Sequence, residues 1–118
     1  MSKGKKIALW VVSILLAAMF LFSGGSKLFA LDKVKPMFVQ YGYPAWFAIL
    51  IGTSEALGAL GLLVPRLAGL AAAGLSIIMV GAVYTHFSHN EFTHGLTPLV
   101  LLILLIGVCY VRFTEAKA

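Results

Sequence analysis

The apolar residues of the chain gather into four long blocks that are separated by short polar segments. The blocks cover residues 7–29, 44–63, 67–87 and 96–112. Each is close to the roughly 20 residues that a helix needs to cross a hydrocarbon core about 30 Å thick. Because lipid offers the backbone no hydrogen-bond partner, a stretch of this kind has to be helical. The pattern therefore predicts an all-α membrane protein, with four transmembrane helices bundled into a single domain over residues 1–118.

The polar segments between the blocks predict how the blocks are connected. Residues 31–43 place Val34, Met37, Phe38 and Tyr41 at helical spacing, so we expect a short amphipathic helix at the membrane interface. We expect this helix to stop at Gly42, and Pro44 to lie in the first turn of the second span. The three residues 64–66 are so few that the second and third spans should form an antiparallel hairpin.

Composition and charge agree with a membrane location. Of the 118 residues, 61% are hydrophobic and 11% are charged, whereas soluble domains carry about 25% charged residues. A water-soluble fold of this size could not hide so much apolar surface, so the lipid bilayer is the expected partner. The net charge of +5 comes with no basic patch or aromatic platform, so we expect no binding to nucleic acid.

The distribution of the basic residues predicts the orientation. If the N-terminus is inside, six basic residues are cytoplasmic, namely Lys3, Lys5, Lys6, Arg66, Arg112 and Lys117. The three on the opposite side are Lys27, Lys33 and Lys35. Basic residues concentrate on the cytoplasmic side of membrane proteins, so we expect both termini in the cytoplasm. Lysines ahead of an apolar stretch are also typical of signal peptides, but the first block is longer than the apolar part of one and lacks a plain cleavage site.

Glu55 is the most unexpected residue in the apolar blocks. It lies about eleven residues into the second block, which corresponds to roughly 16 Å of depth and a position near the midplane. A charged carboxylate is costly there, so we expect Glu55 to face the bundle interior and to be protonated or partnered. Ser76, at similar depth on the third span, is its expected partner. The residue either takes part in proton or ligand chemistry or only joins two helices.

Lys27 and His86 lie near the outer ends of the first and third spans. Lys27 either extends its amino group to the interface or reaches inward to Glu55, where the preceding pair Gly24 and Gly25 lets another helix approach. We slightly favour the first alternative, because the depths differ by most of a leaflet. His86 is suited to exchanging protons with outer water, and its neighbour Tyr84 completes the candidate site of Glu55, His86, Lys27, Ser76 and Tyr84.

Other kinds of chemistry find little support in the sequence. The spacing of His86, His89 and His94, with Glu91 nearby, matches no strong zinc pattern, so we expect no metal site. Cys109 is the single cysteine, which excludes thiol–disulfide exchange within the chain. No phosphate-binding loop, hydrolase triad or haem-binding histidine pair is present either. A redox role would need a diffusible carrier, such as a quinone, or a partner protein.

Five short motifs, in this order and spacing, resemble the DoxX family of small four-helix bacterial membrane proteins, and its DoxX-like branch in particular. They are Gly24-Gly25-Ser26-Lys27-Leu28, Gly42-Tyr43-Pro44, Gly52-Thr53-Ser54-Glu55, Pro65 and Ala82-Val83-Tyr84-Thr85-His86. The resemblance implies a four-helix bundle in the bacterial plasma (inner) membrane. The resemblance also strengthens the hypothesis that Lys27, Glu55 and His86 form a shared polar site. Some members of the family resemble subunits of a thiosulfate:quinone oxidoreductase, and others are associated with oxidative-stress complexes.

Three hypotheses for function follow, and whether the chain is itself catalytic stays open. The first is a subunit or accessory of a redox or quinone-linked system, with a partner redox protein or a second copy of the chain beside it. The second is a proton-coupled small transporter, although small multidrug transporters carry their buried acid in the first span rather than the second. The third is a non-catalytic assembly factor in which the polar residues only lock the bundle.

Overall fold

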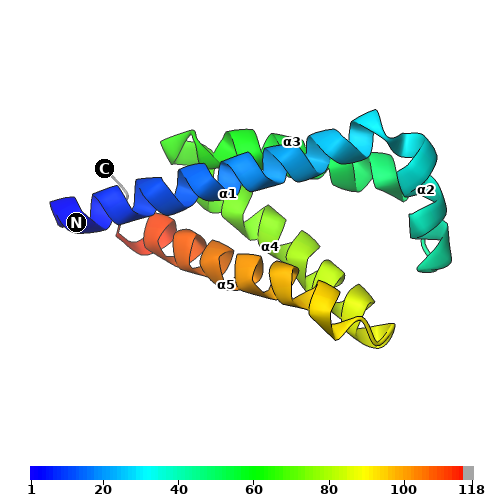
Figure 1. The fold of residues 1–118 in the computed structure, drawn as a ribbon. Helices are drawn as coiled ribbons and strands as arrows, with labels where there is room; N and C mark the ends of the chain where they lie inside the picture. Colours follow the sequence, from blue (N-terminus) through cyan, green and yellow to red (C-terminus); the bar gives the residue numbers. More distant parts are fainter. Residues whose placement is uncertain (116–118) are drawn as a thin grey trace.

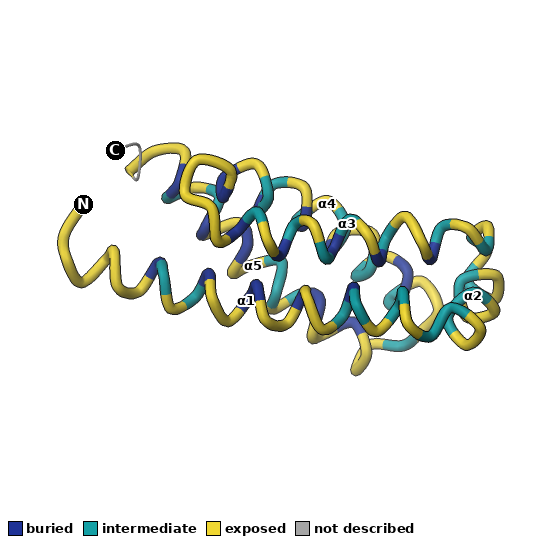
Figure 2. Tube along the Cα trace, turned by 90° about the horizontal axis from the view of Figure 1, so that it is seen from above, coloured by how far each residue is buried: buried dark blue, intermediate teal, exposed yellow. Residues whose placement is uncertain are grey.

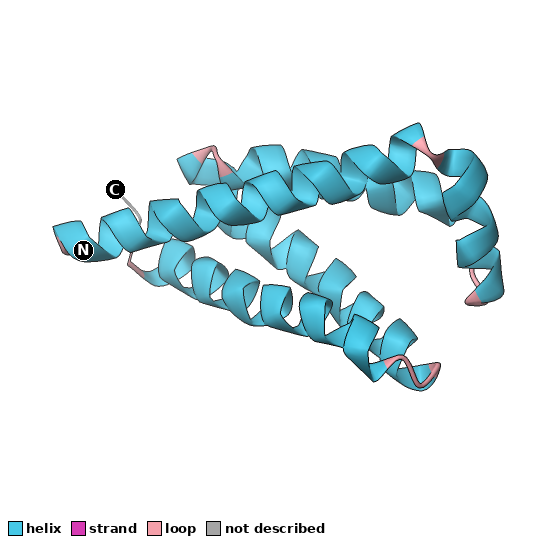
Figure 3. Ribbon diagram, viewed as in Figure 1, coloured by secondary structure: helices cyan, strands magenta, loops and turns pink. Residues whose placement is uncertain are grey.

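The computed structural model describes residues 1–115 and contains five α-helices in that range (Figure 1). They are α1 (Lys3–Phe29), α2 (Leu31–Gln40), α3 (Phe47–Leu62), α4 (Pro65–Ser88) and α5 (Phe92–Thr114). The described residues contain no strand, and short loops join the helices (Figure 3). The all-α prediction is therefore confirmed, whereas Lys117, one of the residues used to predict orientation, lies outside the described range.

Three of the helices, α1, α4 and α5, are long and apolar enough to cross a membrane. The second expected span corresponds to α3, which is shorter, with 16 residues. Pro44 does not begin this helix as expected. It is followed by single turns in which the Phe47 N–H donates to the Pro44 carbonyl at 3.1 Å. The expected amphipathic segment is the helix α2, which buries none of its residues.

Local sequence explains where several helices begin and end. The Ser2 hydroxyl accepts a hydrogen bond from the Lys5 N–H at 3.2 Å and so caps the start of α1. Pro65 occupies the first turn of α4, where its missing N–H is not needed. Gly42 has a φ of +92° directly after the end of α2, a conformation that glycine adopts without strain.

The long helices form two antiparallel pairs, α1 with α3 and α4 with α5. The pairs are joined mainly through α3 and α4, which form the expected hairpin. In Figure 1 the start of α1 and the end of α5 lie at one end of the molecule, which we call the terminal end. The opposite end, which we call the α2 end, holds α2 and the α4–α5 connection, and the two pairs separate toward it.

A small apolar core holds the pairs together. Its largest fully buried side chains are Phe20 and Leu16 on α1, Leu62 on α3, Leu75 on α4 and Leu105 on α5. Buried residues form a narrow stripe on the inner side of each long helix, and most of the outer surface is exposed (Figure 2). Many of the exposed side chains are large and apolar, as with Phe22 at 78% exposed. Lipid is the solvent that such a surface requires.

Two glycines set the closest approach between α1 and α3. A Cβ atom added at Gly24 would lie 2.5 Å from the Gly52 carbonyl oxygen and 2.7 Å from the Ala56 amide nitrogen. One added at Gly52 would lie 3.1 Å from the Lys27 Cβ. Small residues allow helix backbones in lipid to approach in this way. The expectation that the glycines before Lys27 admit another helix is thus confirmed for Gly24, while Gly25 has no neighbour within 4 Å.

Candidate functional site

A buried polar network joins α1 and α3 at their closest approach. The Lys27 amino group lies 2.8 Å from Glu55 Oε1 and donates to the Ser23 hydroxyl at 2.8 Å. The Ser23 hydroxyl lies within hydrogen-bond distance of both Glu55 oxygens, at 3.2 and 3.3 Å. Glu55 is 2% exposed, whereas the Lys27 side chain is 25% exposed. The network is therefore an ion pair with a buried carboxylate and a cation that reaches the surface.

The register of the two helices explains why Lys27 reaches Glu55. The contact between the Gly52 position and the Lys27 Cβ places these residues at the same level, so Glu55 is only about 4.5 Å further along α3. Helical side chains lean toward the N-terminus of their own helix. Since α1 and α3 are antiparallel, Lys27 and Glu55 lean toward each other. The preference for a lysine that only extends to the interface was wrong.

The same register relates the level of Glu55 to α1. A Cβ at Gly24 would lie 3.1 Å from the Glu55 Cβ, so the Glu55 Cβ is level with Gly24. Gly24 is five residues before the end of α1 at Phe29, which corresponds to about 7.5 Å. Because α1 contains 27 residues, its middle lies further toward the terminal end. Glu55 is thus level with a point on α1 that is nearer the α2 end than the middle of α1, while within α3 (Phe47–Leu62) it lies near the middle of the helix.

Ser76, the expected partner of Glu55, is not part of this network. Its hydroxyl donates to the Ala72 carbonyl one turn earlier on α4, at 2.7 Å. This local bond is a common alternative for a serine inside a helix. The partner is instead Ser23, which lies four residues before Lys27 and therefore on the same face of α1. That spacing is the signal in the sequence that would have identified it.

A second polar cluster, at the α2 end, is centred on Glu91. The Tyr41 hydroxyl donates to Glu91 Oε1 at 2.7 Å, and His86 Nδ1 lies 2.8 Å from the same oxygen. The Tyr41 hydrogen bond, followed by that of His86, lowers the pKa of Glu91. The same bond to Glu91 raises the pKa of Tyr41. The cluster ties the residue that follows α2 to the α4–α5 connection.

One further hydrogen bond and one aromatic contact join the segment after α2 to the end of α4. The buried Thr85 hydroxyl donates to the Gly81 carbonyl at 2.7 Å, so at 2.6 Å it accepts from the Tyr43 hydroxyl. His89 Nδ1 lies 2.8 Å from the Thr85 carbonyl oxygen, and its ring packs edge-on against Tyr41 at 5.0 Å between centroids. Tyr84 is 63% exposed and takes part in none of these contacts.

The residues predicted as one site therefore fall into separate places. Lys27 and Glu55 come together, His86 belongs to the Glu91 cluster, and Ser76 and Tyr84 join neither. No hydrogen bond among the described residues links the Lys27–Glu55 network to the Glu91 cluster. Nor do three His, Cys, Asp or Glu side chains within residues 1–115 come together in a way that could hold a metal ion.

A family model described as the DoxX-like family matches residues 11–108. The chain belongs to the DoxX-like family. The match covers both polar clusters, and it confirms the resemblance drawn from the short motifs. No curated protein and no solved structure shows significant similarity to the chain. Family membership and the apolar helices together make this DoxX-like chain a small membrane protein.

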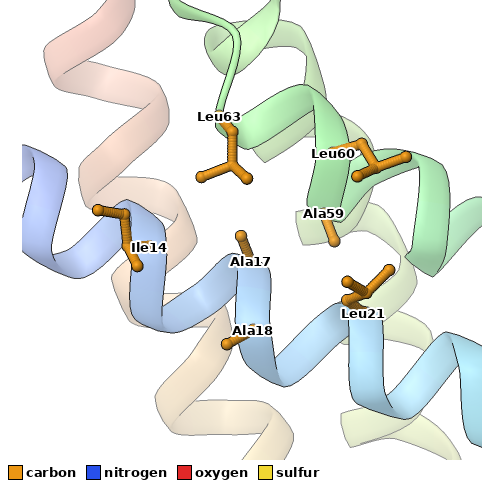
Figure 4. A pocket seen from close by; sticks show the side chains of 7 residues that line it. All are labelled: Ile14, Ala17, Ala18, Leu21, Ala59, Leu60 and Leu63. Carbon is orange, nitrogen blue, oxygen red and sulfur yellow. The ribbon is translucent and has the colours of Figure 1, made fainter.

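The DoxX-like chain also has an apolar groove on the α1–α3 seam (Figure 4). It is lined by Ile14, Ala17, Ala18, Leu21, Ala59, Leu60 and Leu63. Ser23 lies about 180° around α1 from Ile14, as nine residues at 3.6 per turn require. Ile14 thus lies on the other side of α1 from Ser23, and none of the residues that line the groove belongs to the Lys27–Glu55 network, so the groove is not the entrance to the network.

Proposed function

We propose that this DoxX-like protein is a membrane subunit or accessory of a redox or quinone-linked system, and that the Lys27–Glu55 network binds the polar head of a carbonyl-bearing ligand such as a quinone. The observation that carries the proposal is that the Lys27 amino group has one N–H donor without a partner among the described residues. An ammonium group has three N–H donors, and those of Lys27 have two partners among the described residues, Glu55 and Ser23. One donor is left over on a side chain that is one quarter exposed.

The chemistry of the site suits an uncharged acceptor in an apolar setting. Glu55 fixes the position of the ammonium group and balances its charge. The ion pair is therefore already neutral, which favours an uncharged ligand over a charged one. A quinone carbonyl oxygen can accept the third N–H, and a hydrogen bond from a charged donor is stronger than a neutral one. Such a bond favours a reduced, more negative carbonyl oxygen over the oxidised one.

Electron transfer itself is assigned to a partner. Cys109 is a lone cysteine, and residues 1–115 bring together no metal-ligand group. We propose that a partner redox protein, or a second copy of the chain bound to one, supplies the electrons. His86 and Glu91, at the α2 end, are placed to exchange protons with water there.

The proposed topology has four spans, with α3 and its preceding turns as the second. A helix of 16 residues extends about 24 Å, and the turns at residues 44–46 lengthen that span. Helix α2 is proposed to lie at the interface, because it joins polar and apolar residues and buries none of them. The basic residues favour both termini in the cytoplasm, and with this orientation we propose that the Lys27–Glu55 network lies toward the outer face of the plasma membrane.

A purely structural role is the second candidate, and it too has a specific observation in its favour. Both Glu55 oxygens accept hydrogen bonds, and the network lies beside the Gly24–Gly52 approach. A satisfied ion pair at such a crossing can fix the register of two helices without binding a ligand.

Binding of a radiolabelled short-chain benzoquinone to the purified protein in lipid nanodiscs separates the two candidates. We expect Lys27→Met to weaken binding at least about tenfold, the loss of one charge-assisted hydrogen bond. Lys33→Met, which removes an exposed lysine of α2, is the matched control and should bind as the wild type does. Equal binding by wild type and Lys27→Met, with a lower unfolding temperature for Lys27→Met, would leave only the structural role.

A further inference from the structure

Arg112 is a buried cation that has a cation–π contact with Trp10 but lacks hydrogen-bond partners for two of its nitrogen atoms among the described residues. The residue is 9% exposed, and neither its Nε nor its Nη2 atom has a hydrogen-bond partner within residues 1–115. Only one other buried side-chain oxygen or nitrogen in that range lacks a partner, the hydroxyl of Ser13 on α1. An unpaired buried polar group is costly, and more so when it is charged. The arrangement therefore points to an acceptor from outside residues 1–115.

The position of Arg112 separates it from the proposed quinone site. It lies two residues before the end of α5 at Thr114, and its guanidinium carbon is 5.1 Å from the centre of the Trp10 ring on α1. Lys5 and Glu115 form an ion pair at 2.7 Å at this same end. Lys27 lies about 25 Å further along α1 from Trp10. Arg112 thus belongs to the terminal end of the molecule, where α1 meets α5.

The chain's acidic side chains do not supply the missing acceptor. The chain has four of them, and Glu115, the one nearest in sequence, is bonded to Lys5. Glu55 and Glu91 lie in the two clusters near the α2 end, and Asp32 is in the first turn of α2. Glu55, Glu91 and Asp32 are therefore remote from the terminal end.

We propose that Arg112, held against Trp10, binds a phosphate-type oxyanion, either the phosphodiester of a membrane phospholipid or free phosphate. The Nε–H and Nη2–H groups form a planar fork that matches two oxygens of such an anion. The end of a membrane-spanning helix lies at the level of the lipid headgroups, where phosphate is the abundant acceptor. Entry is beside Trp10, the half-buried ring that covers the guanidinium. The bound oxyanion joins α1 to α5 and so ties the two helix pairs together at the terminal end.

Thermal unfolding of the full chain, followed by circular dichroism in a delipidated, phosphate-free sugar detergent, tests this proposal. Three additions are compared: a short-chain phosphatidylglycerol, a diacylglycerol with the same acyl chains, and inorganic phosphate. We expect phosphatidylglycerol to raise the unfolding temperature by about 4 °C or more, and diacylglycerol to leave it unchanged. An equal rise with millimolar inorganic phosphate would identify free phosphate as the ligand rather than the lipid.

Two arginine variants make the result specific. Arg66, the other arginine of the chain, is exposed at the start of α4, so Arg66→Gln should respond as the wild type does. Arg112→Met removes the buried charge and keeps a long apolar side chain. It should be at least as stable as the wild type without phosphate and should lose the response to phosphatidylglycerol. A full response in Arg112→Met, an equal rise with diacylglycerol, or no response of the wild type to either phosphate source would overturn the proposal.

Discussion

Adding one methyl group at Gly24 tests whether the approach of α1 to α3 holds the Lys27–Glu55 network together. In Gly24→Ala the new Cβ would lie 2.5 Å from the Gly52 carbonyl oxygen and 2.7 Å from the Ala56 amide nitrogen. Ordinary contact begins at 3.4 Å, and both neighbours are backbone atoms that cannot rotate away. The helices must therefore separate by about 0.9 Å, which is the difference between these distances.

The size of the effect follows from what this separation breaks. The Ser23 hydroxyl is 3.2 and 3.3 Å from the Glu55 oxygens, so a shift of that size takes both bonds beyond hydrogen-bond range. Overpacking costs about 1–3 kcal/mol and the lost hydrogen bonding about 1 kcal/mol. The better helix propensity of alanine offsets about 1 kcal/mol of this. We expect a net loss of about 1–3 kcal/mol in the free energy of unfolding.

Gly25→Ala is the matched control, because a Cβ at Gly25 meets nothing within 4 Å. It makes the same chemical change on the same helix, so it should leave stability unchanged or raise it slightly. Unfolding of both variants in detergent, followed by circular dichroism, gives the comparison. Labelling with an amine-reactive reagent gives a second measurement, since Lys27 should become more reactive in Gly24→Ala alone. Equal stability and equal Lys27 reactivity in the two variants would refute the reasoning.

Two other predictions concern the charged groups. Lys27→Met leaves Glu55 buried without its cation, so it should cost about 3 kcal/mol in the free energy of unfolding. Adding Glu55→Leu should restore most of this loss. If the double variant is no more stable than Lys27→Met, the unpaired Glu55 carboxylate is not the cause of the loss. The pKa of Glu91 is lowered from 4.5 by Tyr41 and His86, so its stabilisation is complete above pH 4.5 and is lost as the pH falls through the lower folded-state value. Hydrogen exchange of the Tyr41 amide should therefore accelerate in that acid range, and Glu91→Gln should remove this pH dependence. An exchange rate in the wild type that does not change in this range would contradict the prediction.

The sequence was sufficient for the helices because their signals are local. Apolar length and the proline before Arg66 indicate helix and turn without reference to any other part of the chain. Glu55 could also be singled out, because a carboxylate in an apolar block needs a partner wherever that block packs. Which residue serves as the partner depends on the register between α1 and α3. That register follows from the close contact of Gly24 with Gly52, which counting residues from the ends of the apolar blocks does not reveal.

The error over Ser76 has a simple origin. It rested on the assumption that residues at similar depth on neighbouring spans face each other. Helix α3 begins at Phe47, and α1 ends beside the first turns of α3. The lean of antiparallel side chains then closes the remaining distance between Lys27 and Glu55. Sequence spacing alone would have indicated Ser23, through its four-residue separation from Lys27.

The side chains around Glu55 also bear on the choice between a binding site and a transport path. A path for protons or substrate requires polar groups that continue from the network to the terminal end. The fully buried side chains below the network are instead large and apolar, with Phe20 and Leu16 on α1 and Leu62, Leu75 and Leu105 opposite them. Within residues 1–115, the buried polar groups nearer the terminal end are Ser13 and Arg112, and the apolar core separates both from Glu55. Within the described residues, this arrangement favours the proposed binding site over a transport path, because no chain of buried polar groups continues from Glu55 through the core.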